Sequence, residues 1–171
     1  MGPSDGEYIK VTNFGFSLPS DATPTAIKFS VVRKAFSLGG LIDNLVYTVK
    51  GGVIGGDNNA NAGTWLDSDE NLDYAPVGAG ALWGRTWLYT DINASDFGIV
   101  ISPHFASTNT AYMDYVSCTI TYTTTAAGKL MMRKSTRYFR QSFCFLPLLR
   151  TAGGLILPDK QILAPQLTLA G

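Results

Sequence analysis

Residues 111–125, "AYMDYVSCTITYTTT", decide the fold class of this chain. Apolar or sulfur-bearing side chains at Val116, Cys118 and Ile120 alternate with the hydroxyl side chains between them. A period of two, with many β-branched and aromatic residues, is typical of a half-buried strand. We therefore expect one face of this strand to carry Tyr112, Asp114, Val116, Cys118, Ile120 and Tyr122.

Similar segments precede this strand, and glycine-, asparagine- and proline-rich turns separate them. We expect strands at residues 7–19, 26–36, 44–52 and 97–102, and no helix beyond one turn at 91–98 with Asp91 as its cap. One face of the third strand should carry Leu45, Tyr47 and Val49. Short strands at this spacing predict an all-β fold, an antiparallel β-sandwich that is jelly-roll-like.

The segment "AAGK" at 126–129 predicts a boundary between a sandwich domain, residues 1–125, and an extended C-terminal arm, residues 126–171. The arm is rich in leucine and isoleucine, and Pro147, Pro158 and Pro165 exclude one long helix. So much apolar surface is not expected to stay in water. An arm that adds strands to neighbouring subunits, or fills grooves on them, explains both properties.

The charge distribution also indicates that the arm binds a partner. Residues 1–114 hold 12 acidic and 6 basic residues, whereas residues 115–171 hold 1 acidic and 7 basic residues. We expect the arm to dock on the acidic domain of a neighbouring copy. The predicted contact residues are Arg133, Lys134, Arg137, Tyr138, Phe139, Arg140, Leu155, Ile156, Leu157, Ile162 and Leu163.

Nucleic acid is the alternative partner of the basic segment 133–140, "RKSTRYFR", whose arginines would contact phosphates while its aromatic rings stack on bases. The flanking sequences are too apolar for a free nucleic-acid-binding tail, which favours protein docking. No stretch reaches the roughly 18 apolar residues of a membrane span. The start of the chain, "MGPSDGEY", is polar, so we expect no secretion signal.

No residue is assigned a catalytic, cofactor-binding or metal-binding role. The acidic cluster Asp67, Asp69, Glu70 and Asp73 could ligate Ca²⁺, but Leu72 occupies the position where such a loop needs glycine, so a solvated acidic loop is favoured. His104 is the single histidine, and a packed or surface role is expected for it. Cys118 and Cys144 are expected to be buried free thiols.

The order of several motifs resembles a β-sandwich module of tailed-bacteriophage virion proteins. These motifs are "LPSDATPTAIKFSVVRKA", "DNLVYTVKGG", "GGDNNA", "LWGRTW", "DINASDFGIVIS" and "AYMDYVSCTITY", and they lie within residues 14–124. The sequence departs from the family pattern at 36–41, where "FSLGGL" replaces a short polar run, and the resemblance does not extend to 126–171.

The resemblance implies a structural or adhesive virion protein and brings no catalytic residues with it. We expect a homo-oligomeric capsid decoration protein, made in the host cytoplasm, that contacts copies of itself and a major capsid or tail protein. The alternative is a glycan-binding module of a tail fibre or spike. Its sugar platform would consist of Trp65, Tyr74, Trp83 and Trp87.

Overall fold

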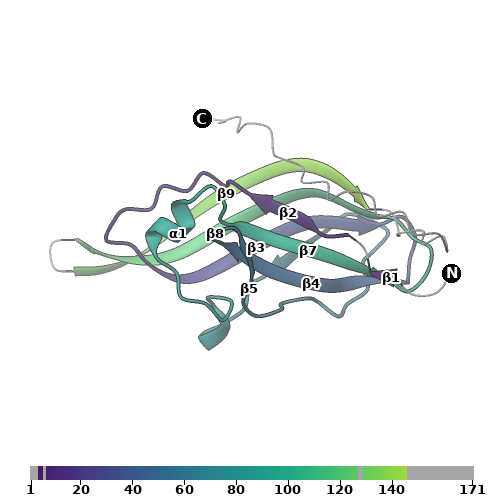
Figure 1. The fold of residues 1–171 in the computed structure, drawn as a ribbon, viewed down its shortest axis with the longest axis horizontal. Helices are drawn as coiled ribbons and strands as arrows, with labels where there is room; N and C mark the ends of the chain where they lie inside the picture. The colour runs from purple at the N-terminus through teal and green to yellow at the C-terminus, as the bar shows by residue number, and fades with distance from the viewer. Residues whose placement is uncertain (1–3, 6, 127–128, 146–171) are drawn as a thin grey trace.

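The computed structural model describes residues 4–5, 7–126 and 129–145, which form two packed antiparallel sheets (Figure 1). The five-stranded sheet contains β1 (Ser4–Asp5), β2 (Ile9–Thr12), β4 (Leu41–Lys50), β5 (Val53–Gly55) and β7 (Gly98–Phe105). The four-stranded sheet has the order β6 (Glu70–Tyr74), β3 (Thr23–Ala35), β8 (Ala111–Ala126) and β9 (Lys129–Phe145). The predicted antiparallel β-sandwich is confirmed.

Helical structure in the described residues is limited to a 3-10 turn at Gly78–Gly80 and a single turn, α1 (Tyr89–Asn93). The helical turn begins two residues before the expected start. Asp91 is therefore its third residue and not the cap, and its carboxylate accepts a hydrogen bond from the backbone N–H of Leu88 at 2.8 Å. No helix in the described part of the chain is long and apolar enough to cross a membrane.

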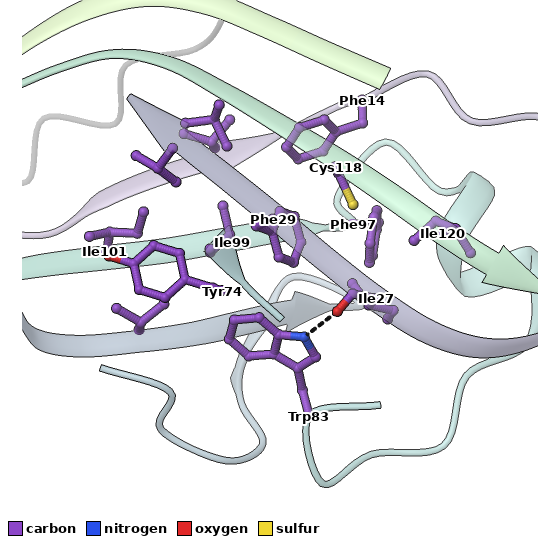
Figure 2. Packing of buried hydrophobic residues seen from close by; sticks show 14 of the residues in the cluster. Phe14, Ile27, Phe29, Tyr74, Trp83, Phe97, Ile99, Ile101, Cys118 and Ile120 are labelled. Carbon is purple, nitrogen blue, oxygen red and sulfur yellow. Dashed lines mark hydrogen bonds between the residues drawn. The ribbon is translucent and has the colours of Figure 1, made fainter. Parts of the chain in front are cut away.

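Aromatic side chains fill the space between the sheets (Figure 2). Phe29 on β3 packs against Phe14, Phe97 and Trp83, with ring centroids 5.6–6.1 Å apart. The indole N–H of Trp83 donates a hydrogen bond to the carbonyl of Ile27 at 2.9 Å, so this large ring is buried with its polar atom satisfied.

The face predicted for β8 is the buried face from Val116 to Tyr122, but the prediction is wrong for Tyr112 and Asp114. Ala111 and Met113 are buried, whereas Tyr112 and Asp114 are only partly buried. The pairing register of β8 shifts between Met113 and Tyr115. An irregularity of this kind reverses the alternation of side chains, and a strict period of two cannot predict it.

The third predicted strand also contains an irregularity, a shift in pairing between Asp43 and Leu45. From Leu45 on the pairing is regular, so Leu45, Tyr47 and Val49 share one face as predicted, although Val49 is buried, Tyr47 is partly buried and Leu45 is exposed. This strand also begins earlier than expected, at Leu41, directly after Gly39 and Gly40. Both glycines have positive φ and lie in the bend that connects β3, which ends at Ala35, to β4.

Four strands lie outside the predicted segments, and two of them, β1 and β5, are only two and three residues long. Residues 70–74, which no predicted strand covers, form β6 along one edge of β3. Residues 129–145, the first part of the predicted arm, form β9, which pairs with β8 of the same chain. The predicted boundary at 125–126 therefore lies at the end of β8, and the strands on its two sides, β8 and β9, belong to the same sheet.

Candidate functional site

Strand β9 forms one open edge of the four-stranded sheet. It contains 17 residues and pairs with β8 from Ala126↔Lys129 to Ala111↔Phe145. In the described part of the chain no strand pairs with its other side, and Figure 1 shows it along the outer margin of the sandwich. A long edge with unpaired backbone N–H and C=O groups is a template on which another strand can pair.

Both faces of β9 are accessible between Met131 and Tyr138. Six of these eight side chains are exposed, and Ser135 and Arg137 are intermediate. In contrast, β8 alternates between buried and partly exposed residues from Val116 to Thr124, with Ser117 buried on its outer face. The opposite sheet therefore covers β8 but does not cover this part of β9.

The exposed part of β9 is positively charged. None of the described ion pairs involves Arg133, Lys134 or Arg137. Arg137 also has a buried Nε atom without a hydrogen-bond partner among the described residues. On the outer face, the Tyr138 ring stacks on Tyr115 with centroids 5.7 Å apart. Within the described residues, the edge thus combines backbone groups that lack a strand partner with cations that lack an ion-pair partner.

The predicted arm residues fall into three groups. Arg133, Lys134, Arg137 and Tyr138 all lie on β9, as described above. Phe139 and Arg140 lie on the same strand opposite Val116 and Tyr115, but their side chains are outside the described set. Five more lie outside the described residues altogether: Leu155, Ile156, Leu157, Ile162 and Leu163. Docking on neighbouring copies stays a prediction, as does the nucleic-acid alternative.

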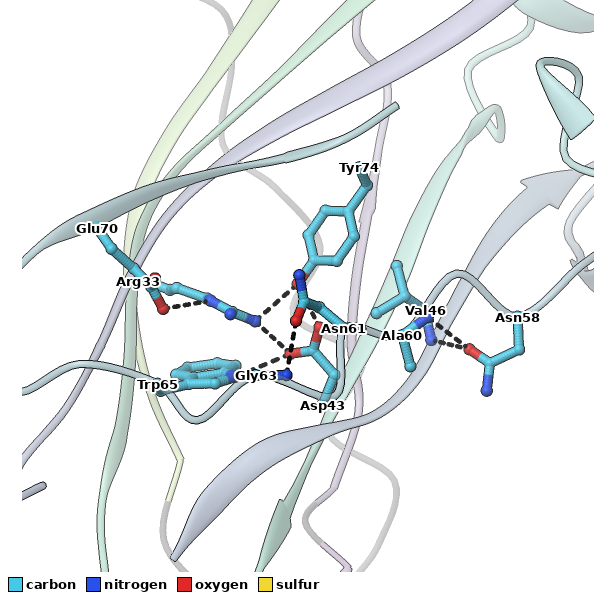
Figure 3. Close-up of polar contacts among 10 residues, drawn as sticks. All are labelled: Arg33, Asp43, Val46, Asn58, Ala60, Asn61, Gly63, Trp65, Glu70 and Tyr74. Atoms are coloured by element: carbon cyan, nitrogen blue, oxygen red, sulfur yellow. Dashed lines mark hydrogen bonds and ion pairs between the residues drawn. The ribbon is translucent and has the colours of Figure 1, made fainter. Parts of the chain in front are cut away.

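A second polar feature, a buried network centred on Asp43, lies between the sheets (Figure 3). The carboxylate of Asp43 accepts hydrogen bonds from the guanidinium of Arg33, from the Trp65 indole at 2.8 Å and from the Tyr74 hydroxyl at 2.8 Å. The backbone N–H of Asn61 donates a fourth hydrogen bond at 2.9 Å. Every expected acceptor position of this buried carboxylate is therefore used.

Arg33 is equally well satisfied. Its Nε donates to Glu70 at 2.8 Å, and its guanidinium lies 4.6 Å from the centre of the Trp65 ring. Burial, together with the neighbouring Asp43 charge, raises the pKa of Tyr74, so its hydroxyl stays protonated and able to donate. Since all these groups are engaged with one another, the network links β3, β4 and β6 and is suited to a structural role.

This network was not predicted from the sequence, although one signal for it was present. Arg33 continues the alternation of Ile27, Phe29 and Val31, which places its side chain between the sheets. An arginine on an apolar face needs an acidic partner. The partner could not be identified, because the irregularity after Asp43 conceals the inward orientation of that residue.

The four rings of the proposed sugar platform belong to the core. Trp65, Trp83, Trp87 and Tyr74 are 0 %, 0 %, 5 % and 4 % exposed. A sugar platform needs a ring face that is open to solvent, so the glycan alternative does not fit these residues. Trp83 and Trp87, which flank Gly84, instead pack edge-on against Phe29 and Phe97 in the core.

Three of the four carboxylates of the acidic cluster pair with separate bases of β3 and are not gathered around a common point. Asp69 pairs with Lys34 at 2.9 Å, and Asp73 pairs with Lys28 at 3.0 Å. No group of three potential metal ligands occurs among the described residues. Cys118 is a buried free thiol whose pKa is raised by burial, as expected, whereas the side chain of Cys144 is outside the described set. His104 lies on β7 opposite Ile42.

Comparisons of the chain with protein-family models, with curated proteins and with solved structures give no match. The class of protein that the geometry itself defines is a β-sandwich with a filled core and an open, basic sheet edge.

Proposed function

We propose that this chain is a non-enzymatic structural protein of a tailed-phage virion, and that β9 contributes to its attachment. The capsid-decoration or cement role is the leading form of the proposal. The observation that carries it is the β9 edge: among the described residues no strand pairs with its outer side, both of its faces are accessible between Met131 and Tyr138, and its cations make no ion pair. The resemblance of residues 14–124 to virion β-sandwich modules supplies the biological setting.

The sandwich is well suited to display on a particle. Its aromatic core and buried ion pair fix the relation between the two sheets. One margin offers a strand for addition to another protein, a mode of recognition in which backbone hydrogen bonds contribute affinity and side chains contribute specificity. The apolar sequence that follows β9, residues 146–171, would extend the contact onto a capsid or tail protein.

The experiment is quantitative protein analysis of purified virions from the phage that encodes the chain. We expect the protein in mature particles at a copy number that follows the capsid lattice. A number that follows the symmetry of the tail would assign it to the tail or fibre. Its absence from particles, with the protein present in infected cells, would overturn the proposal.

A further inference from the structure

We propose that the basic β9 edge pairs with the acidic β6 edge of a second copy, so that the copies associate head to tail through one continuous sheet. The inference rests on the proposed function, because it names the partner for the same edge. β6 and β9 lie at opposite ends of the sheet order β6-β3-β8-β9, so one copy can offer β9 while its β6 receives another copy.

Charge selects β6 among the edges described. Strand β9 contains five basic residues and no acidic residue. Strand β6 contains Glu70 and Asp73 without a basic residue, and Asp67 and Asp69 precede it. In the other sheet, β5 has no charged residue, and the edge formed by β1 and β2 carries Asp5 and Lys10.

The carboxylates of the β6 edge are accessible to a second chain. Asp67 is exposed, and the side chains of Asp69 and Asp73 are 56 % and 48 % exposed although each pairs with a lysine of β3. A carboxylate has about four acceptor positions. Each can therefore keep its lysine and also accept a hydrogen bond from an arginine of β9 in a neighbouring copy.

The same charges disfavour a symmetric β9–β9 pair. Two antiparallel copies of β9 would bring ten basic residues together, five from each strand, with like charges opposite or diagonal to one another. A β9–β6 pair is heterologous, with different surfaces in contact. Repetition of a heterologous contact gives a ring if the rotation closes and a filament if it does not.

The test is a charge swap, measured by sedimentation velocity and native mass spectrometry on the full chain. The β9 variant is Arg133→Glu with Lys134→Glu, and the β6 variant is Asp67→Lys with Asp69→Lys. All four side chains are exposed, so circular dichroism should show folded proteins. We expect each variant to associate at least about tenfold more weakly than the wild type, equivalent to about 1.4 kcal/mol.

Two rescues distinguish the proposed contact from others. A 1:1 mixture of the two variants should recover association, and so should a single chain carrying all four substitutions. The matched control, Lys10→Glu on β2, should associate like the wild type. A β6 variant that associates like the wild type, while the β9 variant does not, would overturn the proposal in favour of β9–β9 pairing.

A wild-type chain that is monomeric at every concentration tested, or variants that associate like the wild type, would overturn the proposal equally. Either result leaves the virion role open, because copy number in particles is measured independently. Absence from particles together with a β9–β6 oligomer in solution would instead remove the virion role and keep the contact.

Discussion

Arg33 and Asp43 form an ion pair whose side chains are 2 % and 0 % exposed, which makes them the most sensitive charged residues in the described chain. Removing a charge from water is unfavourable, and a buried pair is tolerated only when hydrogen bonds satisfy both partners. Here Trp65, Tyr74 and the backbone of Asn61 supply the remaining hydrogen bonds of Asp43. Loss of either charge should therefore leave the other buried and uncompensated.

Replacing Arg33 with Met should lower the free energy of unfolding by about 3–5 kcal/mol, because the charge of Asp43 would remain buried without its cation. Urea unfolding followed by fluorescence measures the change. Lys28→Met is the matched control, since the exposed Lys28–Asp73 pair should contribute no more than about 1 kcal/mol. Equal losses in the two variants would contradict a special role for the buried pair.

The raised pKa of Tyr74 predicts a loss of stability in alkali. The unfolded chain should release the Tyr74 proton near its ordinary value of 10.0, whereas the folded protein retains it to higher pH. This contribution is constant below that value and falls as the pH rises above it, because deprotonation then favours the unfolded state. Tyr74→Phe should remove this part of the pH dependence. Parallel stability curves for the two proteins above pH 10 would refute the prediction.

At the scale of the elements, β9 contributes little to the described core. The buried apolar cluster runs from Val11 to Tyr122 and includes no described side chain of β9. The contacts that its described side chains make are the stacking of Tyr138 on Tyr115 and the hydrogen bond between Thr136 and Thr119, in addition to the backbone ladder to β8. We therefore expect the described core to form without β9.

Truncation tests this separation. A chain ending at residue 125 should still fold into a β-rich domain with cooperative unfolding, but it should not associate, because both β9 and the following segment are missing. A chain ending at residue 145 should keep both the fold and self-association. The measurements are circular dichroism, thermal unfolding and sedimentation velocity. If the longer chain is monomeric while the full chain associates, residues 146–171 and not β9 make the contact.

The strands were predictable from sequence where alternation is regular. Residues 116–122 and 27–31 show this, because each inward side chain is apolar and each outward one is more exposed. Prediction failed before the irregularity near Asp114, where the predicted faces are reversed, and the irregularity near Asn44 concealed the burial of Asp43. β6 was missed because its sequence, "ENLDY", is polar, and its pairing with β3 is a tertiary effect.

The candidate site was predictable in composition but not in placement. The basic residues 133–140 were identified from charge alone. Their position on an edge strand of their own domain depends on the long-range ladder between β8 and β9, in which Thr119 and Thr136 share a hydrogen bond at 2.9 Å. Turn signals near 126–129 are equally compatible with a hairpin and with a domain boundary, and only the boundary was predicted.

Across the whole molecule, the charges separate along the four-stranded sheet. The chain has a formal net charge of zero, yet β9 is basic while β6 and its preceding loop are acidic. A molecule with this distribution attracts a second copy only in certain orientations. Head-to-tail association places the basic β9 edge beside the acidic β6 edge of the next copy. Association through two β9 edges, or through two β6 edges, would bring like charges together, and these repel.

Salt should separate this attraction from the stability of the sandwich itself. Raising the ionic strength from 0.1 M to 1 M shortens the Debye length from about 10 Å to about 3 Å, which screens exposed charges much more than buried pairs. We expect NaCl to weaken self-association at least about tenfold, with little change in the melting temperature of the fold, since Arg33 and Asp43 are shielded from solvent. The chain with all four charge substitutions should show the same salt dependence, because its edges again carry opposite charges. Self-association that is unchanged or strengthened by NaCl would identify apolar contact, through residues such as Met132 at 72 % exposure, as the dominant force.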